Sequence, residues 1–354
     1  MIVYNEYMSI SRKAVGVEIN RYLTSLMTAR ETAASAIHRS YETLWSHIAA
    51  VSSDGKRIRP YLTVLTYGTL DEKIIPVAAA QEIIHIAMLM HDDVMDQEFV
   101  RHGKPNISGL YRSKYETYQR LSANQTAHYA HSITILAGDL LIAEAFRSIE
   151  NAAFTASIRQ QVAQQLSQSL FEVVGGQFMD VQSSFVTDDS FSPLDIYRFK
   201  TASYSFIRPL ITGGICAGWK QPTLDILQEF GTHLGVAFQI QDDLLGVFGD
   251  ETKTGKSSLT DLREGKNTLL RTIHEKHATT EQKKRLVCLG TETATNEELL
   301  AVKHDMVASG AKQETLRLSN EYADKALASL DSLPHRDVAA ALTELVEKLR
   351  GRDV

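Results

Sequence analysis

The 354-residue chain is 44% hydrophobic and 23% charged, which fits a globular protein with a sizeable interior and excludes a mainly disordered chain. Its formal charge of -6 comes from acids and bases mixed along the sequence, which argues against a nucleic-acid binder. The two cysteines, Cys216 and Cys288, lack CxxC or zinc-type spacing, so we expect neither a disulfide framework nor structural zinc.

The N-terminus lacks an apolar core of signal-peptide length, and we find no stretch of about 20 apolar residues that would span a bilayer. We therefore expect a soluble, cytoplasmic protein with no stable membrane insertion.

The seven prolines leave long intervals in which apolar residues recur at spacings of three and four, which predicts an all-α fold. We find no convincing strand set, internal repeat or linker, and so predict one domain, 1–354. Polar segments at 98–125 and 250–267 each follow an acidic cluster and are expected to be lids or binding loops. The clear helices are predicted at 11–30, 31–51, 58–69, 76–97, 126–150, 153–183, 193–203, 206–218 and 223–249, with shorter amphipathic helices after them.

Three aspartates end the apolar helix predicted at 76–97. Asp92 and Asp96 are four residues apart and so share one helix face, with Asp93 beside them. Like charges on an apolar helix repel and lose hydration, and a divalent cation removes both penalties. Oxygen ligands favour Mg²⁺ or a similar hard ion. For this cluster alone, a solvated helix cap is the plain alternative.

A second pair, Asp242 and Asp243, ends another strongly apolar helix, which makes coincidence unlikely as an explanation. Gly246 leaves room for a metal ion or its waters, and Asp250 stays on a neighbouring helix face. Because Mg²⁺ takes one or two carboxylates plus phosphate oxygens, two such clusters suit a diphosphate held between several ions.

These motifs resemble those of the trans-isoprenyl diphosphate synthases, the polyprenyl synthetase family, over nearly the whole chain. DDxxD at 92–96 and QxxDD at 239–243 are that family's two aspartate-rich signatures. The resemblance implies a single large helical bundle of the isoprenoid synthase type, with a central apolar active-site cavity. The supporting motifs follow in the family's order: GKRIRP at 55–60, RHGKP at 101–105, AGD at 137–139, GQFMD at 176–180, KT at 200–201, GK at 255–256 and DLREGK at 261–266.

The resemblance implies that Lys56, Arg59 and His85 hold the diphosphate of isopentenyl diphosphate, for which Lys offers a point charge and Arg a bidentate fork. His85 also shares a helical stripe with the first aspartates. Arg57, at the odd position, is expected to be a solvated charge. The residues that map to the allylic diphosphate are Arg101, Lys200, Thr201, Gln239, Lys256 and Lys266.

The chain departs from the family pattern in two places. His102 stands where the family usually has a second Arg, and a neutral imidazole offers one donor instead of a charged fork, which weakens one isopentenyl diphosphate contact. The stretch 101–137 is longer than usual and rich in tyrosine, and we expect a lid or a partner-contact loop.

In the implied reaction, metal ions and cationic side chains promote the departure of diphosphate from the allylic substrate, because they stabilise the negative charge that develops on this leaving group. The double bond of isopentenyl diphosphate attacks the resulting carbocation, and a proton is lost to the departed diphosphate. The resemblance implies three Mg²⁺ ions with substrate bound, with Mn²⁺ as an alternative. The metal ligands would be Asp92, Asp93, Asp96 and Asp242, and the further catalytic residues would be Asp243, Lys200, Thr201 and Gln239.

Ala87 and Met88 lie one turn below Asp92, where product length would be set. Neither is aromatic and the acidic motif has no insertion, so the resemblance implies a C20 product, geranylgeranyl diphosphate, or a longer one. A class I terpene cyclase is one alternative, although its second motif normally mixes Asn, Ser and Glu. A non-catalytic regulatory subunit is another, although it would be expected to lose acidic ligands. The family also implies a homodimer.

Overall fold

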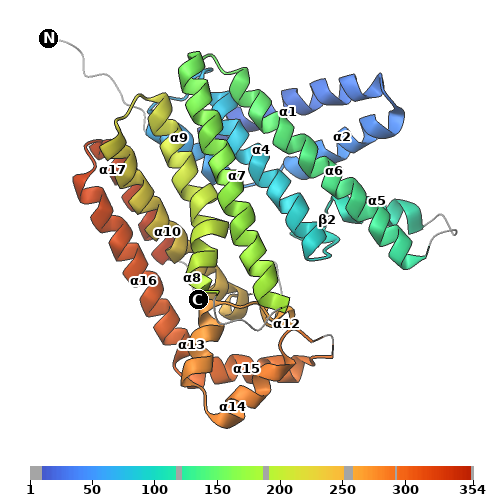
Figure 1. Cartoon of the computed structure of the whole chain (residues 1–354), viewed down its shortest axis with the longest axis vertical. Coiled ribbons are helices and arrows are strands. Elements are labelled where there is room, and N and C mark those ends of the chain that lie inside the picture. The colour runs from blue at the N-terminus through green and yellow to red at the C-terminus, as the bar shows by residue number, and fades with distance from the viewer. Residues whose placement is uncertain (1–9, 117–121, 186–190, 251–257, 292, 352–354) are drawn as a thin grey trace. The chain divides into compact units, whose positions relative to one another are not determined.

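The structure is a computed structural model that describes residues 10–116, 122–185, 191–250, 258–291 and 293–351. Nearly all the described secondary structure is helical, which confirms the predicted all-α fold (Figure 1). The chain divides into two compact units, which are treated separately below. Unit 1 comprises Met1–Leu166 with Thr212–Trp219, and unit 2 comprises Ser167–Ile211 with Lys220–Val354. The prediction of a single domain stays a prediction.

In unit 1, α1 and α2 pack as an antiparallel hairpin, and α4 packs along the length of α6 (Figure 1). A Cβ at Gly138 of α6 would lie 2.3 Å from His91 Nε2 of α4, so the missing side chain permits this close approach. The helices are α1 (Arg12–Ser35), α2 (Arg39–Ser52), α3 (Ile58–Tyr67), α4 (Ile74–Met95), α5 (Ile107–Glu116) and α6 (Ala123–Glu150).

The helix α4 is the most apolar long helix described. By length and composition alone it could cross a membrane, contrary to our expectation from the sequence that no segment would qualify. However, 67% of its most apolar window is buried inside the protein, as expected for a core helix. It is therefore the central helix of unit 1, and it carries the first aspartates at its C-terminal end.

A small hairpin follows α4 where the sequence predicted a loop. Strands β1 (Val100–Arg101) and β2 (Lys104–Pro105) pair antiparallel. The two residues between them, His102 and Gly103, have φ values of 51° and 74°, as in a two-residue type I′ turn. The helix α5 follows directly, so regular structure covers much of residues 98–116, where the polar composition indicated a loop.

In unit 2, α10 (Gln221–Phe248) packs against α16 (Ala311–Ser329) and against an unusual π-helix, η1 (Tyr197–Ile207). The sequence predicted two ordinary helices in this region, whereas the structure has a short α8 (Pro193–Ile196) followed by η1 and then α9 (Arg208–Cys216). Glycines let η1 approach α10: a Cβ at Gly235 would lie 2.3 Å from the Cα of Ala202.

The apolar core of unit 2 gathers side chains from η1, α10 and the C-terminal helices, including Tyr197, Ile240, Leu244 and Leu269. This core fixes the end of α10, where the second aspartate pair lies. The remaining elements are α7 (Ala156–Phe185), which crosses the boundary between the units, α12 (Thr260–Glu264), α13 (Leu269–His277), α14 (Thr280–Arg285), η2 (Leu286–Cys288), α15 (Asn296–Ala308), η3 (Leu330–Ser332) and α17 (Arg336–Arg350).

Candidate active site

The first aspartate cluster sits at the last turn of α4. Asp93 is buried, Asp92 is partly buried, and Asp96 is exposed as the residue that caps the helix. Arg101 on β1 donates from Nε to Asp93 Oδ1 at 2.7 Å and from Nη2 to Asp92 Oδ2 at 3.4 Å. Burial raises the pKa of Asp93 to about 6, against the opposing influence of Arg101. The hairpin thus brings a cation onto the two carboxylates.

The predicted isopentenyl diphosphate residues lie around the start of α3 and on α4. Lys56 is exposed, and Arg59 and His85 are partly buried. Burial, followed by the charges of Arg59, Arg101 and Arg57, lowers the pKa of His85 well below its usual value. His85 is therefore neutral at pH 7, and three arginines are near enough to oppose its protonation.

Arg57 is not the solvated charge that we expected. Its side chain is 3% exposed and donates to Glu82 Oε1 at 2.8 Å, to Asn20 Oδ1 at 2.9 Å and to the carbonyl of Ser52. Arg57 has a left-handed φ of 50° at the start of α3, which turns its side chain inward while Lys56 stays outside. The sequence interpretation of this residue was wrong.

His102 is exposed at the tip of the hairpin. The next strand residue, Lys104, forms an ion pair with Asp54 at 2.7 Å, and His102 also contributes to lowering the pKa of Asp54, for which the Lys104 hydrogen bond is the main cause. The hairpin tip therefore lies against the loop that carries Lys56, which is consistent with a place for His102 near the predicted isopentenyl diphosphate residues.

In unit 2, hydrogen bonds link three predicted site residues. Thr201 Oγ1 donates to Gln239 Oε1 at 2.7 Å, and Gln239 Nε2 donates to Asp243 Oδ1 at 2.8 Å. The hydroxyl of Tyr197 donates to the other oxygen of Asp243. Asp243 is buried, and burial raises its pKa to about 7 although both hydrogen bonds oppose the rise. The adjacent Asp242 is exposed, so the pair is divided between interior and surface.

Lys200 on η1 forms an ion pair with Asp180 of α7. The two helices approach closely because a Cβ at Gly176 would lie 2.3 Å from the backbone nitrogen of Lys200. The GQFMD motif thus has two structural roles. Gly176 allows η1 to come close to α7, and Asp180 forms the ion pair with Lys200.

Gly246 is packed against an acidic side chain. A Cβ on Gly246 would lie 1.8 Å from Asp261 Oδ2, so the Asp261 carboxylate occupies the space that a side chain at this position would need. Lys266 lies 3.6 Å from Asp261 Oδ1 and 2.7 Å from Glu264 Oε2. Lys256, the other predicted loop lysine, lies outside the described residues.

Sequence reasoning missed Tyr197, Asp180 and Asp261 as members of this site. Asp180 and Asp261 belong to motifs that carried the family resemblance, and that was the available signal. Nothing in the sequence marked Tyr197, because its partner is 46 residues away and comes close only through packing. The assignment of individual site residues stays a prediction.

Among the described residues, no three His, Cys, Asp or Glu side chains are grouped so as to hold a metal ion by themselves. Each aspartate cluster offers one or two outward carboxylates, which is the number that Mg²⁺ commonly takes from a protein when substrate phosphates complete its shell. The donor set therefore fits an ion that is bound together with a diphosphate.

Ala87 and Met88, the predicted length-setting residues, differ in exposure. Ala87 is fully buried, whereas Met88 is partly exposed. Of the two positions, a larger side chain is therefore easier to accommodate at Met88.

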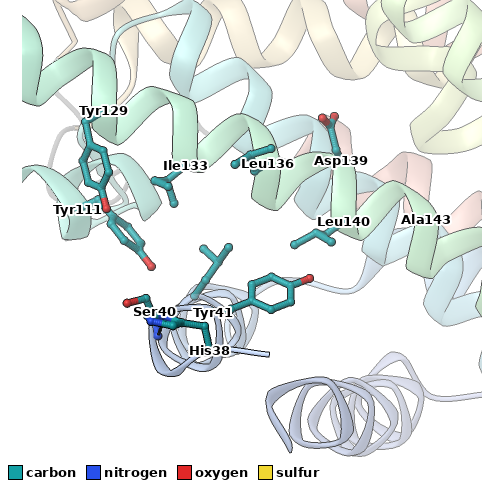
Figure 2. A pocket seen from close by; sticks show the side chains of 11 residues that line it. His38, Ser40, Tyr41, Tyr111, Tyr129, Ile133, Leu136, Asp139, Leu140 and Ala143 are labelled. Atoms are coloured by element: carbon teal, nitrogen blue, oxygen red, sulfur yellow. Dashed lines mark hydrogen bonds between the residues drawn. The ribbon is translucent and has the colours of Figure 1, made fainter. Parts of the chain in front are cut away.

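A separate apolar pocket of about 550 Å³ lies in unit 1 between α2, α5 and α6 (Figure 2). Tyr129, Ile133, Leu136 and Leu140 line it from α6, and Tyr41 faces them from α2. Of the predicted site residues that the structure describes, none lines this pocket.

Comparison with known proteins identifies the family. The polyprenyl synthetase family model matches residues 41–306. A short chain isoprenyl diphosphate synthase of Methanocaldococcus jannaschii is 36% identical, covering 69% of this chain and 70% of that protein. Heptaprenyl diphosphate synthase component 2 of Geobacillus stearothermophilus is 31% identical, with 86% and 88% covered. The crystal structure of geranylgeranyl pyrophosphate synthase from Corynebacterium glutamicum, complexed with isoprenyl diphosphate and magnesium, is similar with a TM-score of 0.88 and 28% identity, with 96% and 99% covered.

The chain therefore belongs to the polyprenyl synthetase family. It is a trans-prenyltransferase that condenses isopentenyl diphosphate with an allylic diphosphate, as predicted from the aspartate motifs. The names of the relatives range from short-chain to heptaprenyl synthases, so the length of the product is left open.

Proposed function

We propose that this chain elongates an allylic diphosphate to geranylgeranyl diphosphate (C20), or to a longer product, by Mg²⁺-assisted ionisation. The observation that carries the proposal is the end of α4, where Asp92 and Asp93 meet the guanidinium of Arg101. Carboxylates for cations and a cation for phosphate are thus present at one place, as a metal-bound diphosphate requires.

The proposed metal-binding residues are Asp92, Asp93 and Asp96 in unit 1 and Asp242 in unit 2. The raised pKa of Asp93 reflects a poorly solvated charge, and a nearby divalent cation would relieve this. We propose three Mg²⁺ ions in the substrate complex, with Mn²⁺ able to replace them. When bound, these ions stabilise the negative charge of the leaving diphosphate.

Basic residues would hold the two substrates. Lys56, Arg59, His85 and His102 are assigned to isopentenyl diphosphate, and the charge of Arg59 contributes to the lowered pKa of His85. On the allylic side, Arg101, Lys200, Lys256 and Lys266 would bind the diphosphate. Thr201 and Gln239, fixed to each other at 2.7 Å, would present oxygen dipoles to the allylic cation. Isopentenyl diphosphate then attacks the cation, and the departed diphosphate accepts the proton.

The purified chain tests the proposal directly. Incubated with farnesyl diphosphate, labelled isopentenyl diphosphate and Mg²⁺, it should release C20 or longer products in reversed-phase chromatography. Accumulation of farnesyl diphosphate alone from a geranyl primer would refute the proposed length. Full activity of Asp92→Ala or Asp242→Ala, with folding unchanged by circular dichroism, would refute the proposed site.

We also propose a cytoplasmic homodimer. The helix α7 exposes Phe171, Val174 and Phe178 (77%, 58% and 63%) at a spacing that places them on one face, and such a stripe is commonly covered by a partner. The apolar pocket on α6 adds a second uncovered surface (Figure 2). A second copy is the favoured partner, and light scattering after gel filtration tests it. A monomer that becomes active only with another subunit would favour the heteromeric arrangement.

A further inference from the structure

The phenol of Tyr197 joins three elements of unit 2. This residue opens η1, is 4% exposed, and donates its hydroxyl proton to Asp243 on α10. The same oxygen accepts a hydrogen bond of 2.7 Å from the backbone N–H of Leu269, the first residue of α13. Both hydrogen-bonding capacities of the phenol are therefore used in the interior of the unit.

The position of Asp243 sets the orientation of Gln239. When Asp243 is ionised, its carboxylate accepts hydrogen bonds and cannot donate them, which places the amide nitrogen of Gln239 toward Asp243 and the amide oxygen toward Thr201. The Thr201 hydroxyl must then donate to Gln239. The direction of every hydrogen bond in the chain from Leu269 to Thr201 is thus determined. It is determined by the Asp243 carboxylate, because Tyr197 donates to one of its oxygens and Gln239 donates to the other.

We propose that Tyr197 is a positioning residue for the condensation. Its hydroxyl keeps Asp243 in place in the interior of unit 2. Asp243 in turn orients the amide of Gln239, and Gln239 orients the hydroxyl of Thr201 for contact with the allylic substrate. This inference rests on the proposed roles of Gln239 and Thr201. It also gives the two members of the second aspartate pair different roles, because Asp242 is exposed and is the proposed metal ligand, while Asp243 is buried and orients its neighbours.

The contact with Leu269 extends the arrangement along the chain. Leu269 follows the segment that carries Lys266 and Asp261, so the phenol also fixes the point at which that segment joins α13. The hydroxyl of Tyr197 thus forms hydrogen bonds both with Asp243 and with the residue that follows the segment of Lys266, a predicted diphosphate ligand.

The variant Tyr197→Phe removes the hydroxyl and keeps the ring in the core. We expect kcat to fall about 10- to 100-fold, since an oriented hydrogen bond to a buried charge is lost. The KM for isopentenyl diphosphate should stay within about twofold, because its proposed ligands lie in unit 1. Tyr22→Phe is the matched control: this partly buried tyrosine of α1 is bonded to Ser148, and its loss should leave kcat unchanged.

A double-mutant cycle separates positioning from simple stability. If Tyr197 acts through Asp243 and Gln239 on Thr201, then Tyr197→Phe should cost little further kcat in a Thr201→Val background. Multiplicative losses in the double variant would overturn the inference, as would a Tyr197→Phe enzyme with normal kcat. A normal Thr201→Val enzyme would overturn it too, and would also remove Thr201 from the proposed site. An impaired Thr201→Val enzyme beside a normal Tyr197→Phe enzyme would leave the proposed function standing and reject only the role of Tyr197.

Discussion

The guanidinium of Arg57 and the carboxylate of Glu82 form a buried ion pair, with 2.8 Å between Nη1 and Oε1 and only 3% exposure of either side chain. The pair ties the start of α3 to the middle of α4. Lys56 immediately precedes Arg57, and Arg59 closely follows it. The ion pair therefore also fixes the backbone from which the side chains of Lys56 and Arg59, the two predicted diphosphate ligands, project.

Breaking this pair on one side should destabilise the protein strongly. Arg57→Met leaves Glu82 buried without its cation, and losses of about 3–5 kcal/mol are typical for such sites. The double variant Arg57→Met with Glu82→Leu should recover much of the loss, because no unpaired charge remains. Denaturation midpoints measure both effects. Equal destabilisation by the single and the double variant would show that the pair has no such role.

Replacing Arg101 should affect the free and the substrate-bound enzyme in opposite ways. In the structure its guanidinium holds Asp92 and Asp93, so Arg101→Ala frees these carboxylates for a cation. We expect Mn²⁺ to bind the substrate-free variant more tightly than the wild type, as followed by electron paramagnetic resonance. Turnover should nevertheless fall at least about 10-fold, because a charged contact to the allylic diphosphate is lost. Weaker Mn²⁺ binding would contradict the competition between Arg101 and metal.

The contact between Gly246 and Asp261 predicts a compensating swap. Gly246→Ala would place a Cβ 1.8 Å from Asp261 Oδ2, so the carboxylate must move, and we expect about a 10-fold loss of kcat. Gly246→Asp should be similarly impaired while Asp261 is present. Combined with Asp261→Gly, it should recover much of the activity, because a carboxylate again lies beside Asp242. A double variant that is no better than Gly246→Asp would argue against this interpretation.

Product length should respond to Met88 more cleanly than to Ala87. Met88 is partly exposed, so the fold can accommodate Met88→Phe, and the larger side chain one turn below Asp92 should shift the products toward farnesyl diphosphate. Ala87 is fully buried, so Ala87→Phe should overpack α4 and lower stability by about 1–3 kcal/mol. Chromatography of the products and thermal denaturation separate the two outcomes. An unchanged product from a stable Met88→Phe enzyme would place the length determinant elsewhere.

His274 should make a destabilising contribution to the fold in mild acid. This side chain is fully buried, its Nδ1 lies 2.8 Å from Ser309 Oγ, and burial lowers its pKa although Asp305 opposes the shift. The folded state thus favours the neutral ring, and this stabilisation is present above pH 6.5 and is lost as the pH falls through the lowered folded pKa. Melting curves at pH 7 and pH 5 should show a smaller loss, by about 2 °C, for His274→Gln than for the wild type. The exposed His304→Gln should behave like the wild type.

The sequence was sufficient for the all-α class and for most helices, because these depend on local spacing. The two aspartate clusters could be found in the same way at the ends of α4 and α10, and their role as metal ligands stays a prediction. It failed where tertiary packing decides the outcome. The π-helix depends on helices coming close at Gly176 and Gly235, and the burial of Arg57 depends on a left-handed backbone turn. Tyr197 was missed for the same reason, since its partner Asp243 is distant in sequence.

The π-helix η1 has a consequence for comparison and engineering. A π-helix closes its hydrogen bonds over five residues instead of four, so it holds more chain per turn than the α-helices on either side. Deleting one residue between Tyr197 and Ile207 would let this stretch close as an ordinary α-helix, and the side chains within the stretch would then point in different directions. Lys200 and Thr201 would then point away from Asp180 and Gln239. Any alignment gap or loop graft placed within this stretch would therefore separate the two residues from their partners.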